Sequence, residues 1–212
     1  MGALTAVLLG LPLTLLITVV SFVIGFILAI PLVVALRSEW APVRLFFRFL
    51  VDLIRGIPII VWLFIIYFGI VIGHFKFKPI QAAIVGFSLI SAAYLAEILR
   101  GGIQSVHFGQ WEAAEALGLK RSTAFLNIVA PQAYRITSPS IATYLIGLLK
   151  DSSIASTIGV TEMVYYSTNF ARQNPGPDAL TPFFIAALVY IVVSVPLAVL
   201  ARRLDARLRK AA

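Results

Sequence analysis

The composition of this chain excludes an ordinary soluble domain. Its 212 residues are 60% hydrophobic and only 12% charged, whereas about a quarter of the residues in a soluble domain are charged. The net charge of +8 would suggest a nucleic-acid partner in a soluble protein, but here the basic residues flank apolar runs, where membrane topology explains them. With no cysteine and only two histidines, thiolate chemistry and a metal site in this chain are excluded as well.

Apolar runs long enough to cross a bilayer recur along the chain. A hydrocarbon layer about 30 Å thick needs roughly 20 apolar residues per helix. We expect the first run to be a retained helix and not a signal peptide, because no basic region precedes it and no small-residue cleavage site follows it. Pro58, inside the second run, predicts a kink there. The sequence therefore predicts an all-α integral membrane protein with about five spanning helices, at 6–36, 45–72, 80–99, a weaker and interrupted 136–158, and 183–201.

The positions of lysine and arginine predict the orientation in the membrane. Cytoplasmic loops are enriched in both residues. The loop after the first run, the loop after the third and the C-terminal tail are basic, whereas the loops on the opposite side carry only Lys76, Lys78 and Arg172. The N-terminus is therefore expected outside and the C-terminus in the cytoplasm, an arrangement that an odd number of spans requires.

A short helix is predicted inside the polar cytoplasmic loop at 110–131. Residues 111–117 are mostly good helix formers, the glutamates favour the positive N-terminal end, and Gly118 is placed to cap the other end in a left-handed conformation. A helix resting on the membrane surface would carry Lys and Arg on its polar face, whereas this one carries Glu112 and Glu115. Docking to another protein is therefore favoured. The residues expected to make the contact are Gln110, Trp111, Glu112, Ala113, Ala114, Leu117 and Gly118.

The same loop carries a motif with a defined spacing. Glu112-Ala113-Ala114, followed by Gly118, Ile128 and Pro131, resembles the EAA loop of permease subunits in bacterial ABC importers. Ala130 is a departure, since the loop pattern usually has leucine before the proline. It lies outside the docking helix, so it affects the expected packing and leaves the resemblance in place.

The sequence around the loop is similar to the polar amino acid branch of that family. The similarity lies in residues 94–106, 131–135, 150–154 and 158–160. Residues 55–58, which read Arg-Gly-Ile-Pro, are similar to the Arg-Gly-Thr-Pro signature of the family, with isoleucine as a departure.

The resemblance implies a permease that is driven by a separate ATPase. Residues 1–212 would form one type I transmembrane domain of an ABC importer, multi-pass in the bacterial cytoplasmic membrane, with its coupling loop at about 105–131. It would move polar amino acids by alternating access. No phosphate-binding loop of the form G-x-x-x-x-G-K-[ST] occurs in the sequence, so ATP and Mg²⁺ are expected in the partner, and no catalytic residue or cofactor is expected here. The implied partners are ABC ATPase subunits, a second permease subunit that is identical or paralogous, an extracytoplasmic amino-acid-binding protein and membrane lipid.

Charged residues near the cytoplasmic ends of the second and third runs are functional candidates, because charge at membrane depth is costly. Glu97 and Arg100 are three residues apart, so they share a helix face and can pair, and Arg55 is expected at a similar depth. We predict a gate or a set of structural ion pairs. Mutual neutralisation is favoured over direct contact with substrate.

Polar residues also interrupt the fourth run, and irregular backbone at membrane depth is tolerated where it lines a cavity. Asp151 and Glu162 could hold the ammonium group of an amino acid, and the hydroxyls of Ser152 and Ser153 could hold its carboxylate. These four residues are the candidates for substrate binding. The alternative is equally open: hydroxyls in membrane helices commonly bond to their own backbone or to a neighbouring helix.

Two other functions remain as alternatives. An ion-gradient-driven secondary transporter would be supported by inverted repeats, but no convincing duplication is visible and the acidic docking helix would have no role. A membrane scaffold subunit would use the loop only to recruit a partner. Co-purification of an ATPase whose hydrolysis is stimulated by substrate separates both alternatives from an importer.

Overall fold

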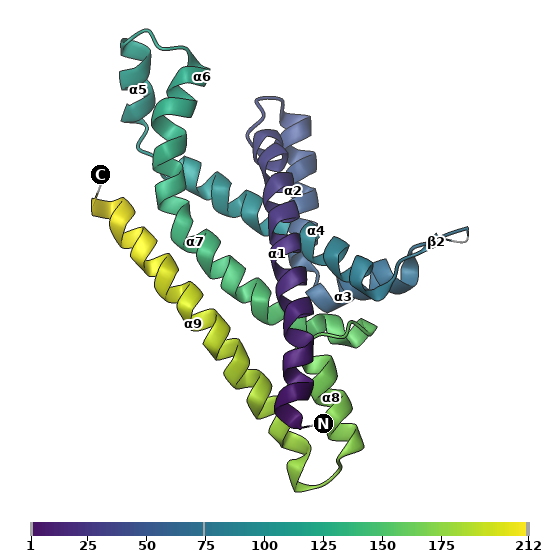
Figure 1. Ribbon diagram of the computed structural model, residues 1–212. Coiled ribbons are helices and arrows are strands. Elements are labelled where there is room, and N and C mark those ends of the chain that lie inside the picture. Colours follow the sequence, from purple (N-terminus) through teal and green to yellow (C-terminus); the bar gives the residue numbers. More distant parts are fainter. Residues whose placement is uncertain (1, 74, 211–212) are drawn as a thin grey trace.

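The computed structural model of the chain describes residues 2–73 and 75–210, most of which are helical (Figure 1). This confirms the predicted all-α class, apart from a small antiparallel hairpin. The helices and strands, in chain order, are α1 (Ala3–Leu36), α2 (Ala41–Gly56), α3 (Ile59–Phe64), the π-helical turn η1 (Ile65–Gly69), β1 (Val71–Ile72), β2 (Phe75–Lys76), α4 (Pro79–Gln104), α5 (Gly109–Ala116), α6 (Arg121–Ala124), the π-helical turn η2 (Phe125–Val129), α7 (Ala130–Asp151), the 3₁₀ helix η3 (Ser152–Ile158), α8 (Met163–Gln173), the 3₁₀ helix η4 (Pro177–Leu180) and α9 (Thr181–Lys210).

The longest helix, α1, runs through the molecule and packs against α4 and α8 (Figure 1). Helix α7 contacts both α4 and α9. The start of α1 and the turn between α8 and α9 lie at one end of the molecule, whereas α5, α6 and the end of α9 lie at the other. The N-terminus and the expected docking helix are therefore far apart. The orientation in the membrane stays a prediction.

Within residues 2–73 and 75–210, three helical segments are long and apolar enough to cross a membrane: α1, α4 and Pro177–Arg203, which holds η4 and most of α9. The second expected run, 45–72, is not one continuous helix. Helix α2 ends at Gly56, and the helical segment after it is bent away by 99°. Pro58 lies at this break, as predicted, because proline lacks a backbone donor and disfavours helix in the residue before it. By length and composition, the part of the chain that the structure describes holds three candidate spans, or four if the bent pair is one. A fifth span through α7 stays a prediction.

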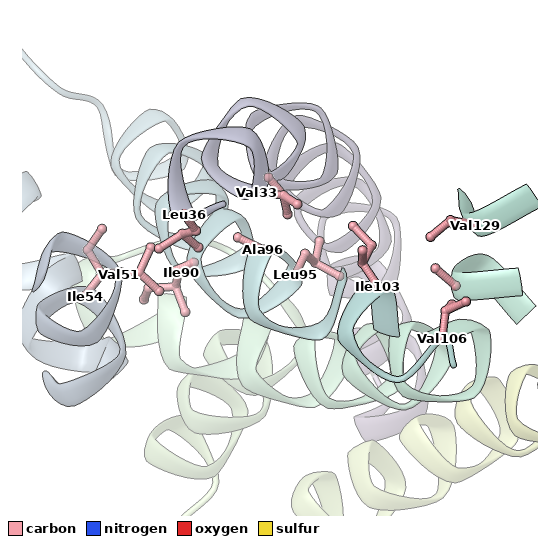
Figure 2. Close-up of a cluster of buried hydrophobic side chains, with 13 residues drawn as sticks. Val33, Leu36, Val51, Ile54, Ile90, Leu95, Ala96, Ile103, Val106 and Val129 are labelled. Carbon is pink, nitrogen blue, oxygen red and sulfur yellow. The ribbon is translucent and has the colours of Figure 1, made fainter. Parts of the chain in front are cut away.

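A buried cluster holds α1, α2, α4 and the start of α7 together (Figure 2). Large apolar side chains on the outer faces of α1 and α9 are instead exposed, such as Val34 at 69% and Val192 at 68%. Apolar surface of this extent is expected where lipid covers a protein. The labelled members of the buried cluster are Val33, Leu36, Val51, Ile54, Ile90, Leu95, Ala96, Ile103, Val106 and Val129.

Gly25 allows α1 to approach α4 closely. A Cβ atom at this position would collide with the Cβ of Ser91, and it would lie 3.1 Å from the backbone nitrogen of Ala92 and from the carbonyl oxygen of Ser88. Small residues at such crossings let membrane helices pack tightly. We expect Gly25→Ala to lower the free energy of unfolding in detergent by about 1–3 kcal/mol. Gly147→Ala on α7, where the added atom meets nothing within 4 Å, is the matched control, and equal melting temperatures for the two variants would contradict this contact.

Candidate functional site

Helix α5 is the short helix that the sequence predicts in this loop, and it ends at a left-handed glycine. Gly118 has φ +69°, which confirms the predicted cap. Its backbone N–H donates to the carbonyl of Glu115 at 2.9 Å, and the N–H of Leu119 donates to the carbonyl of Ala114 at 3.0 Å. This pair of bonds is the Schellman motif, and it satisfies carbonyls that would otherwise lack donors.

The residues expected to dock a partner divide between two faces of α5. Gln110, Glu112 and Ala113 are exposed, and Leu117 is 76% exposed at the end of the helix. In contrast, Ala114 is buried and Trp111 stacks on Phe125 of η2, with ring centroids 6.4 Å apart. Trp111 and Ala114 therefore hold α5 to the rest of the chain. The sequence could not separate the two faces, because all seven residues lie on one short helix or its cap.

The packing of α5 connects it to the centre of the molecule. Trp111 contacts η2, and η2 runs without interruption into α7. Figure 1 shows α5 and α6 at the outer end of α7, whose other end leads into η3. π-Helical turns such as η2 are found mostly inside α-helices and often at functional sites. The segment formed by η2 and α7 is therefore one continuous helical arm. It runs from the contact with α5 to the interrupted fourth run.

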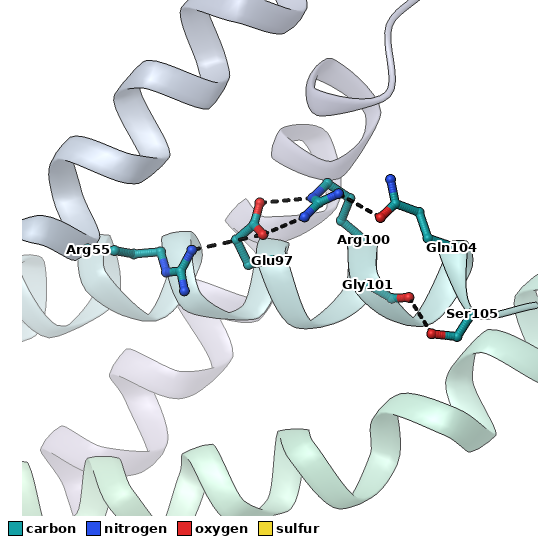
Figure 3. Close-up of polar contacts among 6 residues, drawn as sticks. All are labelled: Arg55, Glu97, Arg100, Gly101, Gln104 and Ser105. Carbon is teal, nitrogen blue, oxygen red and sulfur yellow. Dashed lines mark hydrogen bonds and ion pairs between the residues drawn. The ribbon is translucent and has the colours of Figure 1, made fainter.

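Arg55, Glu97 and Arg100 form a ladder of polar contacts on α2 and α4 (Figure 3). Arg100 donates from Nε and Nη2 to the two carboxylate oxygens of Glu97, at 2.9 and 2.7 Å. Arg55 Nη1 lies 3.9 Å from Glu97 Oε2, and Arg100 Nη1 donates to Gln104 Oε1 at 2.7 Å. The structure thus brings together the three charged residues that the sequence singled out. A bidentate arginine–carboxylate pair is among the stronger side-chain contacts, which fits structural pairing; a gating role stays a prediction.

Two tyrosines that sequence reasoning missed extend this ladder to α7. The guanidinium of Arg55 lies 5.1 Å from the ring centroid of Tyr94. Tyr94 stacks on Tyr144 of α7 at 5.6 Å, and the Tyr144 hydroxyl donates to Ser91 Oγ at 2.9 Å. Three helices that are distant in sequence are joined here. The available signal was Tyr94 itself, a polar aromatic residue one helical turn before Glu97.

The fourth run is interrupted where the sequence predicts. Helix α7 ends at Asp151, η3 follows, and Gly159 then takes φ +88°. The Asp151 side chain is exposed, whereas Ser152 is buried and donates to the carbonyl of Leu149 at 2.7 Å. Ser153 is half-buried. The Ser152 hydroxyl therefore bonds to the backbone of its own segment, which is the alternative that the sequence left open. Among the four candidates for substrate binding, Asp151 is the exposed one.

Glu162 is fully buried and caps α8. Its carboxylate accepts hydrogen bonds from the backbone N–H groups of Val164, at 2.9 Å, and Tyr165, at 2.7 Å. The hydroxyl of Tyr190 on α9 donates to the same carboxylate at 3.4 Å. Both oxygens of Glu162 thus have partners in the chain, which sets it apart from the exposed Asp151. A role in substrate binding stays a prediction, and the contacts favour a structural one.

A row of small and polar residues on α7 leads up to Asp151, and sequence reasoning missed the part of the row that precedes Lys150. Ser140, Thr143 and Gly147 precede Lys150 and Asp151 at spacings of three and four residues, so all five share one helix face. Four of them are exposed and Gly147 is half-buried. If α7 lies at membrane depth, as the sequence predicts, polar side chains on its exposed face are expected to line a solvated path or a protein contact, not lipid. The helical spacing of Ser and Thr was the available signal.

These features together define the class of protein. Apolar spans, charged and aromatic contacts between them, and an exposed helix held outside them by a continuous arm are the parts of an integral membrane protein that moves solutes. The chain belongs to the family described as the binding-protein-dependent transport system inner membrane component, which matches residues 21–210. Members of this family are permeases and are not themselves catalytic.

Three relatives from Bacillus subtilis (strain 168) cover most of the chain. The probable amino-acid ABC transporter permease protein YckA is 39% identical over 181 residues, which are 85% of this chain and 79% of the relative. The arginine transport system permease protein ArtQ is 37% identical over 204 residues, which are 94% of this chain and 91% of the relative. The L-cystine transport system permease protein TcyB is 34% identical over 200 residues, which are 92% of this chain and 85% of the relative.

Two solved structures share the fold. The crystal structure described as an amino acid ABC transporter with histidines has a TM-score of 0.89 and 28% sequence identity, and the likeness covers 96% of this chain and 94% of that one. An inward-facing MetNI methionine ABC transporter has a TM-score of 0.73 over 97% and 95% of the two chains. Its sequence identity of 22% supports the fold alone.

Proposed function

We propose that this chain is the transmembrane permease subunit of an ATP-binding cassette importer that moves polar amino acids across the bacterial cytoplasmic membrane. The observation that carries the proposal is family membership over residues 21–210, in a chain that presents α5 as an exposed helix. Relatives named for amino acids, arginine and cystine support the substrate class.

The energy for transport comes from ATPase subunits that dock on the exposed face of α5. The small side chain of Ala113 lets a partner protein come close to the α5 backbone, and Leu117 has an exposed apolar side chain that the partner would cover. Because Trp111 is stacked on Phe125, a displacement of α5 moves η2 and, through it, α7. ATP and Mg²⁺ bind in the partner. Alternating access then follows from motion of α7 against α4 and α9.

A second permease subunit, identical or paralogous, completes the pathway. The polar row on α7, from Ser140 to Asp151, would face that pathway, while lipid covers the outer faces of α1 and α9. An extracytoplasmic binding protein delivers the amino acid at the end of the molecule that holds the turn between α8 and α9. The chain as a whole acts as one multi-pass domain, with 105–131 as its coupling loop.

Asp151 is the residue of this chain best placed to meet the substrate. Its carboxylate is exposed at the end of the polar row on α7, where it could pair with the ammonium group that every amino acid carries. Asp151→Asn removes one charge-assisted contact. We therefore expect the amino acid concentration that gives half-maximal stimulation of ATP hydrolysis to rise about tenfold. Assembly with the ATPase should be unchanged. Asp52→Asn, which changes an exposed carboxylate on α2, is the matched control, and an unchanged dependence in Asp151→Asn would remove Asp151 from the site.

The proposal is tested by ATP hydrolysis of the purified complex in lipid nanodiscs. The permease, its ATPase and its binding protein are assayed against a panel of single cationic, acidic and amide amino acids. Stimulation by one class is the expected result, and it identifies the substrate. An intact complex that no amino acid stimulates would overturn the substrate class and favour a scaffold role.

A further inference from the structure

A pocket of about 770 Å³ lies between the ends of α1 and α4 and the inner face of α5. Arg37 and Arg121 line it, together with Gln104, and Glu115 is the one acidic residue in its lining. Trp111 and Ala114, the residues of α5 that face the chain, form another wall. The pocket is therefore separate from the polar row on α7 and from the exposed docking face of α5.

Of the two arginines in this pocket, Arg121 has an ion pair at the surface, and Arg37 has none among the residues that the structure describes. Burial, followed by the positive charges of Arg121 and Arg100, lowers the pKa of the Arg37 guanidinium. Arg121 pairs with Glu39 at 2.9 Å, but both side chains are at least 80% exposed, and a surface pair of this kind contributes little. Two guanidinium groups in one pocket, each with several N–H donors, form a strong site for a planar or tetrahedral oxyanion.

Gln104 adds a neutral donor whose direction is fixed. Arg100 donates to its Oε1 at 2.7 Å, and because a guanidinium can only donate, the amide must turn its NH₂ group away from Arg100. That NH₂ group has no partner among the described contacts, and Gln104 lines the pocket. The donor set thus comes from three separate elements: the residue after α1, the end of α4 and the start of α6.

We propose that this pocket binds the phosphate group of an anionic ligand and so braces α5 against the ends of α1 and α4. The position favours a phospholipid headgroup as the source, because the candidate spans α1 and α4 both end at the pocket, at Leu36 and Gln104, where headgroups lie. Phe108, which also lines the pocket, is 70% exposed, as expected for an aromatic side chain at the membrane interface. Basic pockets between spans on the cytoplasmic side bind such headgroups. A soluble phosphate is the other source of the same chemistry.

The test measures lipid binding to the purified full chain by native mass spectrometry, so its outcome does not depend on the proposed transport function. The probes are phosphatidylglycerol, phosphatidylcholine and inorganic phosphate. The wild type should retain one phosphatidylglycerol in preference to phosphatidylcholine. The double variant Arg37→Gln/Arg121→Gln should lose affinity on the order of twentyfold, whereas the matched control Arg202→Gln, an exposed arginine of α9, should not.

A second variant guards against loss of binding through misfolding. Glu115→Gln removes the only negative charge from the pocket lining and should strengthen phosphatidylglycerol binding about fivefold. Displacement of the lipid by inorganic phosphate, with the same dependence on the two arginines, would support the phosphate site and make a soluble anion its ligand. Equal lipid retention by the double variant and Arg202→Gln, or weaker binding by Glu115→Gln, would overturn the proposal.

Discussion

Gly118→Val is expected to separate the ATPase from the permease while leaving the spans folded. Gly118 holds φ +69°, a conformation that costs a residue with a side chain about 1–2 kcal/mol, and more for a β-branched one. The last turn of α5 would relax, and with it the exposed Leu117. Affinity for the ATPase should fall by roughly 5- to 30-fold, measured by co-purification and by ATP hydrolysis of the complex.

Two further substitutions at Gly118 separate backbone strain from charge. A Cβ atom added here meets nothing within 4 Å, so the backbone conformation, and not a collision at Cβ, is what opposes a side chain. Asparagine tolerates the left-handed conformation, and Gly118→Asn should bind the ATPase nearly as the wild type does. Gly118→Asp fits the backbone equally well but adds a charge at the docking face, and it should uncouple the complex. Normal assembly and transport in both Gly118→Val and Gly118→Asp would show that α5 is not the docking element.

Glu162→Ala is expected to be among the most destabilising single changes in the chain. Two backbone N–H groups of α8 would lose their acceptor in a buried position, and the contact with Tyr190 of α9 would also be lost. The cost should be about 2–4 kcal/mol, which corresponds to a fall in melting temperature of about 4–16 °C for a chain of this length. Thermal unfolding in detergent measures it.

Glu162→Gln tests whether the same residue also binds substrate. Glutamine keeps one carbonyl oxygen that accepts from one of the two α8 N–H groups, but its NH₂ group cannot accept from the other, so the variant should lose less stability than Glu162→Ala and still fold. If Glu162 only caps α8, stimulation of ATP hydrolysis by amino acid stays near the wild-type level. A well-folded Glu162→Gln complex that has lost its stimulation would instead place Glu162 in the substrate site.

Features that depend on short stretches of sequence could be predicted. The cap at Gly118 follows from glycine after a run of helix formers, and the break at Pro58 follows from the geometry of proline. The pairing of Glu97 with Arg100 follows from their spacing on one helix. In each case the residues that decide the structure are close together in the chain.

Features that depend on packing between distant elements could not be predicted. The inward face of α5 is set by the contact of Trp111 with Phe125, and the link from Tyr94 to Tyr144 joins residues 50 apart. The sequence indicated that Pro58 would bend the second run, but the angle of 99° depends on how α3 packs. The cap that Glu162 forms on α8 could not be predicted either, because the sequence alone does not show where α8 begins.

The most direct test of the central claim is uptake of a labelled amino acid into proteoliposomes. The permease is reconstituted with its ATPase and binding protein, and ATP is supplied on the side that carries α5. Accumulation above the external concentration should require ATP and should be lost with Gly118→Val but kept with Gly118→Asn. Accumulation driven by an imposed proton or sodium gradient, without ATP, would contradict an ATP-driven importer and identify a secondary transporter instead.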